Sequence, residues 1–290
     1  MKRLAGVGLL CAGIFLGLGL GGCETTQRSL RPLLEARSDD TLWRYKDEPE
    51  DVVYLTIDDG PSPQTAALLD VLADFDATAT LFLHTEGMSD PAVIRRALTE
   101  GHNLGNHMPA DKSWAGERAD VFLAAAQESH CALAQFGDGY SGHFRPPHGR
   151  INRETMVPGL ASLGIDGPQT FVMASYAPWD AGGVTELEWR SAARWFARRY
   201  GAGLGKAVAP GDIVVFHDGP RYTRTENTKI SLRLFLEEIR DRGLRAEALP
   251  PRGFADEVCS FDNRPVETAS LEGMPKSHLG AEPTDHDNDQ

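Results

Sequence analysis

The stretch Thr56-Ile57-Asp58-Asp59-Gly60-Pro61 follows an apolar run, residues 52–55, that predicts a buried strand. Gly60 and Pro61 then end that strand in a sharp turn. Because neighbouring side chains on a strand point to opposite faces, Asp58 and Asp59 need a bend to reach one cleft, and the Gly-Pro turn can supply it. In such a cleft one carboxylate can bind a metal ion while the other takes a proton from water. Two solvated aspartates are the alternative interpretation, because aspartate is common in turns.

Strand and helix patterns alternate between residues 52 and 249. The predicted strands are 52–57, 78–83, 102–106, 170–174, 212–216 and 244–249, and the predicted helices are 64–75, 91–100, 117–136, 152–163, 186–200 and 230–242. This alternation favours an α/β fold with a parallel sheet covered by helices, and both a doubly wound sheet and a barrel fit it. In either architecture the active site lies at the carboxyl ends of the strands.

Residues 1–22 predict an export signal rather than a part of the fold. They begin with Lys2 and Arg3, continue as an apolar run rich in glycine and leucine, and end in small residues before Cys23. This pattern resembles the bacterial lipoprotein signal, which implies cleavage before Cys23, a lipid on that residue and anchoring to a membrane of the cell envelope. An ordinary signal peptide with an incidental cysteine is the alternative.

The rest of the chain divides into three predicted parts. Residues 23–50 are predicted as a tether, residues 51–260 as the folded domain and residues 261–290 as an acidic, disordered tail with few large apolar side chains. The formal net charge of −13 argues against a nucleic-acid partner, because such binding needs clustered lysine and arginine. We predict no protein partner.

Two cysteines, Cys131 and Cys259, fall within the predicted domain. An exported compartment permits a disulfide between them. Their spacing neither supports nor excludes one, and two buried thiols are the simpler interpretation.

A second polar stretch contains His107 and Asp111, which are four residues apart. One turn of chain can aim both side chains at a common point. Together with Asp59 they provide three nitrogen or oxygen ligands and leave an open position, which is the arrangement of a hydrolytic metal site. A histidine and an aspartate on an ordinary loop are the alternative.

The third stretch, Arg145-Pro146-Pro147-His148-Gly149, is a stiff loop, because its two prolines restrict the backbone. Arg145 on this loop can pair with Asp58 and keep it ionised as a base. A surface arginine beside a proline-rich turn is the alternative.

Two further stretches follow predicted strands. Trp179 and Asp180 place an aromatic ring beside a carboxylate, and Val215 lies two residues before His217 at the end of an apolar strand. A histidine in this position is well placed to act as a general acid. A loop tryptophan that only packs, and a core histidine satisfied by one hydrogen bond, are the alternatives.

In their joint order, the five stretches resemble the motifs of the polysaccharide deacetylases, the family that shares the NodB homology domain and is also called carbohydrate esterase family four. The resemblance implies a distorted (β/α) barrel over about residues 51–260. It implies that Asp58 is the catalytic base, that Arg145 pairs with it, and that Asp180 orients His217, the acid. The implied metal ligands are Asp59, His107 and Asp111, and the implied substrate groove contains Pro147, His148, Trp179 and Val215. The chain departs from the family pattern at Asp111, where histidine is usual, and at His148, where tyrosine is common.

The resemblance implies a metal-dependent hydrolase that removes acetyl groups from an N-acetylated polysaccharide at the cell envelope. Peptidoglycan, chitin-like polymers and exopolysaccharides are all open as substrates. The expected cofactor is Zn²⁺, with Co²⁺ or another divalent ion as the alternative. Two other functions stay open: an esterase for O-acetylated polysaccharide such as xylan, and a carbohydrate-binding surface lipoprotein without activity. The remaining histidines, His84, His102, His130 and His143, are predicted to be structural, with His84 the nearest to the cleft.

Overall fold

The computed structural model describes residues 39–46, 49–176, 178, 180, 190–219, 226–255 and 258–259. The folded unit ends at Cys259. The predictions for the signal at 1–22, lipidated Cys23, Trp179 and the tail at 261–290 concern residues outside this description. No helix in the described ranges is both long and apolar enough to span a membrane.

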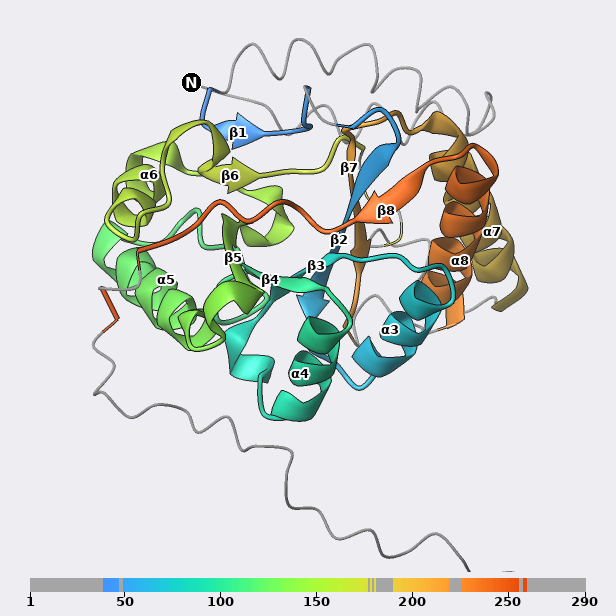
Figure 1. Cartoon of the computed structure of the whole chain (residues 1–290). Helices are drawn as coiled ribbons and strands as arrows, with labels where there is room; N and C mark the ends of the chain where they lie inside the picture. Colours follow the sequence, from blue (N-terminus) through green and yellow to red (C-terminus); the bar gives the residue numbers. More distant parts are fainter. Residues whose placement is uncertain are drawn as a thin grey trace, which may run out of the picture. The chain divides into compact units, whose positions relative to one another are not determined.

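A parallel sheet, six-stranded in the described part of the chain, forms the centre of the folded unit (Figure 1). Its strands are β5 (Tyr140–Phe144), β4 (Asn103–Asn106), β3 (Thr80–Leu83), β2 (Val52–Gly60) and β7 (Ile213–His217) in that order, and β8 (Arg245–Glu247) pairs with the start of β2. A second, two-stranded parallel sheet joins β1 (Thr41–Leu42), which lies in the predicted tether, to β6 (Phe171–Val172). The predicted α/β fold is confirmed, and it is of the distorted-barrel type.

Helices separate the strands and cover the sheet (Figure 1). They are α3 (Thr65–Ala73), α4 (Pro91–Thr99), α5 (Ala119–Ala134), α6 (Arg153–Ala161), α7 (Arg190–Ala207) and α8 (Glu226–Asp241). Helix α4 begins where the sequence directs it, because Pro91 fixes the first turn and the Asp90 side chain accepts the Ala92 N–H.

Helix α7 continues seven residues beyond its predicted end at residue 200, through three glycines. Two of these glycines lie against α8. A Cβ atom at Gly201 would overlap the carbonyl oxygen of Ser231, and one at Gly205 would lie 2.6 Å from the Cβ of Glu238. The glycines therefore permit close packing of the two helices, and this packing outweighs their weak intrinsic preference for helix.

The alternation of side chains along β2 positions the functional site. Val53, Leu55 and Ile57 point into the core beneath α3, α7 and α8. Val52 and Tyr54 point to the other face, into a separate apolar cluster with Phe82, Val172, Ile213 and Leu249. This second face becomes polar at Thr56 and Asp58, both of which are buried. The interior of the barrel therefore ends in a carboxylate at the carboxyl edge of the sheet.

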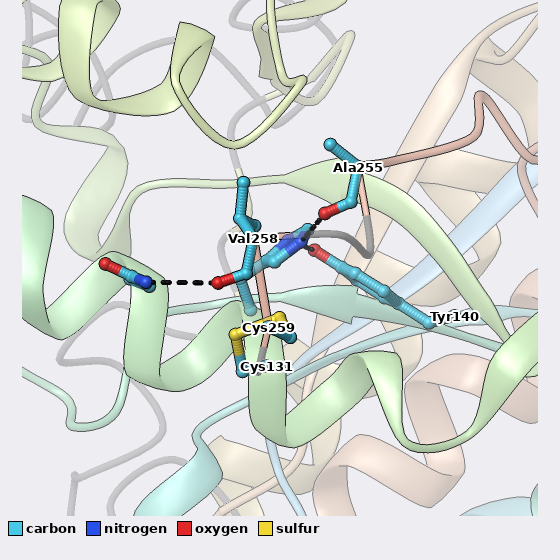
Figure 2. The surroundings of a disulfide bond; sticks show 7 residues. Cys131, Tyr140, Ala255, Val258 and Cys259 are labelled. Atoms are coloured by element: carbon cyan, nitrogen blue, oxygen red, sulfur yellow. Dashed lines mark hydrogen bonds between the residues drawn. A yellow bond between two sulfur atoms is a disulfide. The ribbon is translucent and has the colours of Figure 1, made fainter. Parts of the chain in front are cut away.

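A disulfide joins Cys131 on α5 to Cys259 (Figure 2). It corrects the simpler prediction of two free thiols, because the segment after β8 returns across α5. The return is fixed by His130, whose Nε2 donates to the Ala255 carbonyl at 3.0 Å, and by Gln127, whose amide donates to the Val258 carbonyl at 3.3 Å. His130 is buried and structural, as predicted.

Candidate active site

A cavity of about 570 Å³ opens at the carboxyl ends of the sheet strands. It is lined by Asp58, Asp59, His107, Asp111, Arg145, Pro146, His148, Gly149, Arg150, Met173, Ala174, Pro178, Val215 and His217. The structure thus places most of the predicted site residues around one space. Pro147 is buried in the turn Pro147–Gly149 beside the cavity rather than among its lining residues.

Asp58 and Asp59 both reach the cavity because the backbone bends between them. Asp58 continues the inner face of β2, in register with Phe82 on β3 and His217 on β7. The register with β3 then shifts between Asp58 and Gly60, and Asp59 adopts a φ of 70°. The predicted bend is present, but it is centred on Asp59 instead of on the Gly-Pro turn. A non-glycine residue at positive φ costs about 1–3 kcal/mol and is typical of functional sites.

Three potential metal ligands lie close together, and two of them, Asp59 and His107, line the cavity. One ligand atom from each of Asp59, His84 and His107 lies within 4.8 Å of the other two. Oδ1 of Asp59 lies 3.2 Å from Nε2 of His84 and 3.3 Å from Nε2 of His107. Burial alone would raise the pKa of Asp59, but hydrogen bonds from the two imidazoles hold that pKa well below its ordinary value.

The outer contacts of the two histidines fit metal binding. Nδ1 of His107 donates to the Arg145 carbonyl at 2.8 Å, and Nδ1 of His84 donates to the Met108 carbonyl at 3.3 Å. Because Nδ1 keeps its proton in these contacts, loss of the proton from Nε2 exposes a lone pair that each ring can present to an ion. Two imidazoles and one carboxylate form a donor set that suits a divalent transition metal, and they leave positions open for water and substrate.

The third ligand corrects two sequence predictions. His84, predicted to be structural, belongs to the metal group, whereas Asp111 does not. Nε2 of His148 lies 3.0 Å from Oδ1 of Asp111 instead. The spacing of four residues between His107 and Asp111 would align their side chains only in a helix, but Met108 turns the chain with a φ of 66°. The carboxyl end of β3 supplies the missing ligand.

Asp58 is held by a buried arginine, as predicted. Nη1 of Arg145 donates to Oδ1 of Asp58 at 2.6 Å and to the hydroxyl of Thr56 at 2.7 Å. Nε of Arg145 donates to the Val172 carbonyl at 3.0 Å, and the guanidinium lies over the Phe82 ring. The other carboxylate oxygen, Oδ2 of Asp58, lies 3.9 Å from Nε2 of His107 and so faces the metal group.

His217, which lines the cavity, forms a second buried pair with Asp180. Nδ1 of His217 lies 3.1 Å from Oδ1 of Asp180, whose Oδ2 accepts the backbone N–H of His217 at 2.8 Å. Burial alone would lower the pKa of His217. The charge and hydrogen bond of Asp180, together with the charges of Asp58 and Asp59, outweigh burial and raise this pKa to about 9. The raised pKa favours the protonated imidazole, which can donate a proton into the cavity.

Asp218 supports the site without lining the cavity, and it was not among the predicted site residues. Its carboxylate accepts hydrogen bonds from the hydroxyls of Ser62 and Thr65, which follow the bend at Asp59. A Cβ atom at Gly60 would lie 2.9 Å from Oδ2 of Asp218, so the absent side chain at Gly60 makes room for this carboxylate. The one signal in the sequence that could have indicated a role for Asp218 is its position directly after His217.

Comparisons with known proteins extend these observations. Residues 45–167 match the family model described as polysaccharide deacetylase. A chitooligosaccharide deacetylase of Rhizobium leguminosarum bv. trifolii is 41% identical over 212 residues, which cover 70% of this chain and 87% of that protein. A peptidoglycan-N-acetylglucosamine deacetylase of Bacillus cereus is 27% identical over 183 residues, which cover 60% of this chain and 62% of that protein. The crystal structure of the Bc1960 peptidoglycan N-acetylglucosamine deacetylase matches the fold with a TM-score of 0.59 at 18% identity, covering 76% of this chain and 95% of that one.

Proposed function

The chain belongs to the polysaccharide deacetylase family, and from this premise we propose that it is a metal-dependent hydrolase that cleaves the acetamido groups of an N-acetylated polysaccharide. One observation carries the proposal. The base candidate Asp58, the metal-group residues Asp59 and His107, and His217 with its raised pKa all line one cavity, and His84 completes the metal group beside them. These are the parts that hydrolysis of an amide needs: activation of water, stabilisation of an oxyanion and protonation of an amine.

Asp59, His84 and His107 would hold the metal, for which we propose Zn²⁺ because imidazole and carboxylate donors suit it. When bound, a divalent ion acts as a Lewis acid that polarises a carbonyl oxygen and lowers the pKa of water. This role fits the position of the group at the base of the cavity, beside Oδ2 of Asp58.

Asp58 takes the proton from the attacking water. Arg145 occupies its Oδ1 and fixes the carboxylate plane, which leaves Oδ2 directed towards the metal group as the proton acceptor. Thr56 and Val172 in turn fix Arg145, so the base is held by a buried network rather than by one contact.

His217 gives a proton to the leaving nitrogen. An amine anion is a much poorer leaving group than an alkoxide, so an amide requires a proton at this point more strongly than an ester does. The Asp180 partner that keeps His217 cationic therefore favours N-deacetylation over removal of O-acetyl groups.

We also propose that the protein is an exported lipoprotein that acts at the cell envelope on peptidoglycan, a chitin-like polymer or an exopolysaccharide. The apolar segment that ends before Cys23 supports export and lipidation. The disulfide between Cys131 and Cys259 supports an oxidising compartment, because disulfides are rare in reducing ones.

Acetate release from N-acetylglucosamine oligomers tests the enzymatic proposal. The protein should be inactive after removal of metal by a chelator and should regain activity with Zn²⁺ or Co²⁺. Asp58→Asn should retain the metal and lower kcat by about 10²–10⁴-fold, the usual contribution of a general base. Release of acetate only from O-acetylated xylan would favour the esterase alternative, and no release from any glycan by the metal-loaded protein would favour a binding role.

A further inference from the structure

The cavity contains a second histidine–carboxylate pair that the catalytic roles above do not use. Nε2 of His148 lies 3.0 Å from Oδ1 of Asp111, and both residues line the cavity. The two come from separate loops, one after β4 and the other after β5. Two segments far apart in sequence therefore meet through this pair.

The pair lies nearer to solvent than the metal group. The side chains of His148 and Asp111 are each 30% exposed, whereas those of Asp59, His84 and His107 are between 4% and 10% exposed. The metal group is thus at the base of the cavity and the pair is towards its mouth. Asp111 is not a member of the metal group, and its carboxylate lies against His148.

The backbone places the imidazole of His148 at a conformational cost. His148 has a φ of 58° and is followed by Gly149 with a φ of 62°, between a stiff Pro146-Pro147 segment and Arg150. Positive φ is strained for a residue with a large side chain, and such strain is typical of binding and catalytic sites. A glycine would adopt this turn more easily, which indicates that the side chain of His148 has a use in the cavity.

The size of the cavity indicates what that use is. A volume of about 570 Å³ is far more than one acetyl group fills, so the sugar ring that carries the acetyl group must occupy the outer part. A ring in that position presents hydroxyl groups to the residues at the mouth. Nε2 of His148 faces the carboxylate of Asp111 and therefore carries the ring hydrogen. In the neutral imidazole the other nitrogen, Nδ1, is then an acceptor for a sugar hydroxyl.

We propose that Asp111 and His148 form a sugar-binding pair, in which His148 contacts a ring hydroxyl of the N-acetylated sugar and Asp111 orients the imidazole. Asp111 is then a positioning residue and not a metal ligand. This inference rests on the proposed function, because it assigns the outer part of the same cavity to the sugar. The pair then determines which sugar is recognised, and it takes no part in hydrolysis of the acetyl group.

The test compares a sugar substrate with an acetyl substrate that has no sugar. The kcat/KM values of metal-loaded His148→Ala and Asp111→Asn are measured for N-acetylglucosamine oligomers and for 4-nitrophenyl acetate. In each variant the ratio of the two values, oligomer over ester, should fall about tenfold, as expected for one lost hydrogen bond, mainly through a higher KM for the oligomer. The double variant should show little further loss, because the two residues act as one unit.

Metal content separates this role from metal ligation. Asp111→Asn should bind as much Zn²⁺ as the unaltered protein, measured by elemental analysis at limiting Zn²⁺, whereas His84→Ala should lose it. Asp120→Asn, which removes an exposed partner of Arg118 away from the cavity, is the matched control and should change neither quantity. Loss of Zn²⁺ from Asp111→Asn, or an unchanged substrate ratio in both single variants, would overturn the proposal.

Binding without turnover distinguishes a failure of this inference from a failure of the proposed function. Calorimetry of the metal-free protein with the oligomer should give an affinity about tenfold weaker for His148→Ala than for the unaltered protein. If the unaltered protein binds the oligomer but releases no acetate, the proposed function fails while this comparison still tests the pair. Equal affinities of the two proteins would refute the pair.

Discussion

The backbone N–H of Asp218 donates a 2.7 Å hydrogen bond to the carbonyl oxygen of Asp58, so the chain leaving β7 is bonded to the residue that we propose as the base. The Asp218 side chain adds a second connection, because it accepts the hydroxyls of Ser62 and Thr65 on the segment that follows Asp59. Through Asp218, the end of β7 fixes both sides of the bend that places the two site carboxylates.

Asp218→Ala should therefore lower the free energy of unfolding by about 2 kcal/mol, because a charge-assisted network is lost and the hydroxyls of Ser62 and Thr65 both lose a carboxylate acceptor. Turnover should fall several-fold as the bend at Asp59 loosens. Urea denaturation measures the first effect. Thr65→Val removes one of the two donors and should lose about half as much, and an equal stability of Asp218→Ala and the unaltered protein would show that the network is not needed.

His84→Ala should abolish tight metal binding, because it removes one of the three ligands at the base of the cavity. Elemental analysis after dialysis against a weak chelator measures the bound Zn²⁺. His102→Ala is an informative comparison, since His102 is buried at the start of β4, where its Nδ1 accepts the Ala79 N–H, and it should retain the metal. Full metal content in His84→Ala would show that His84 is not a ligand and would favour Asp111 as the third ligand.

Asp180→Asn should lower the pKa of His217. Burial lowers this pKa, and the variant removes the negative charge of Asp180, which is the main cause that raises it. In the metal-free protein, NMR titration of the His217 ring should give a pKa of about 9 for the unaltered chain and a value 1–3 units lower for the variant. In the proposed mechanism the protonated ring is the active form, so kcat/KM falls as the pH rises through the pKa of His217. This fall should begin at a lower pH in Asp180→Asn than in the unaltered protein. An unchanged titration would exclude Asp180 as the source of the raised pKa.

His102 and His143 should make the fold sensitive to acid. Burial is the main cause that lowers the pKa of each to about 4, below the unfolded value of 6.5. Between pH 6.5 and 4 the unfolded chain binds protons that the folded chain excludes, so stability is complete above pH 6.5 and is lost as the pH falls. The loss by pH 4 is on the order of 3 kcal/mol per histidine.

Replacing one of these histidines isolates its share of the acid sensitivity. His143 donates from Nε2 to the Pro250 carbonyl, and the side-chain amide in His143→Gln can make the same kind of bond. The slope of unfolding free energy against pH should fall by about 1.4 kcal/mol per pH unit between pH 4 and 6.5. Denaturant titrations at several pH values measure this slope, and no change in it would mean that His143 is charged in the folded state.

Patterns within one element were enough to predict the sheet and part of the site. The apolar run before Asp58 and the turn after it indicate a central strand ending in two carboxylates, and β2 has that form. The pairing of Arg145 with Asp58 was predicted from the stiff loop that carries Arg145, whereas the pairing of Asp180 with His217 was implied only by the resemblance to the polysaccharide deacetylases.

The predictions that were wrong concern contacts between distant segments. His84 is a lone histidine after an apolar strand, and nothing in its neighbours shows that it meets Asp59 and His107. Asp111 was misplaced because a positive φ at Met108 is not visible in the residue type. The end of α7 and the disulfide depend on where α8 and the last segment pack, and no periodicity within a single element encodes that packing.

The disulfide also determines how mechanical force passes through the molecule. Cys259 is the last residue of the folded unit, and its sulfur is bonded to Cys131 on α5. A pull on the chain beyond Cys259 is therefore transmitted covalently to α5, and it bypasses β8 and the segment that crosses α5. The elements between Cys131 and Cys259, from β5 to β8, lie inside a covalently closed loop and carry none of that tension along the chain.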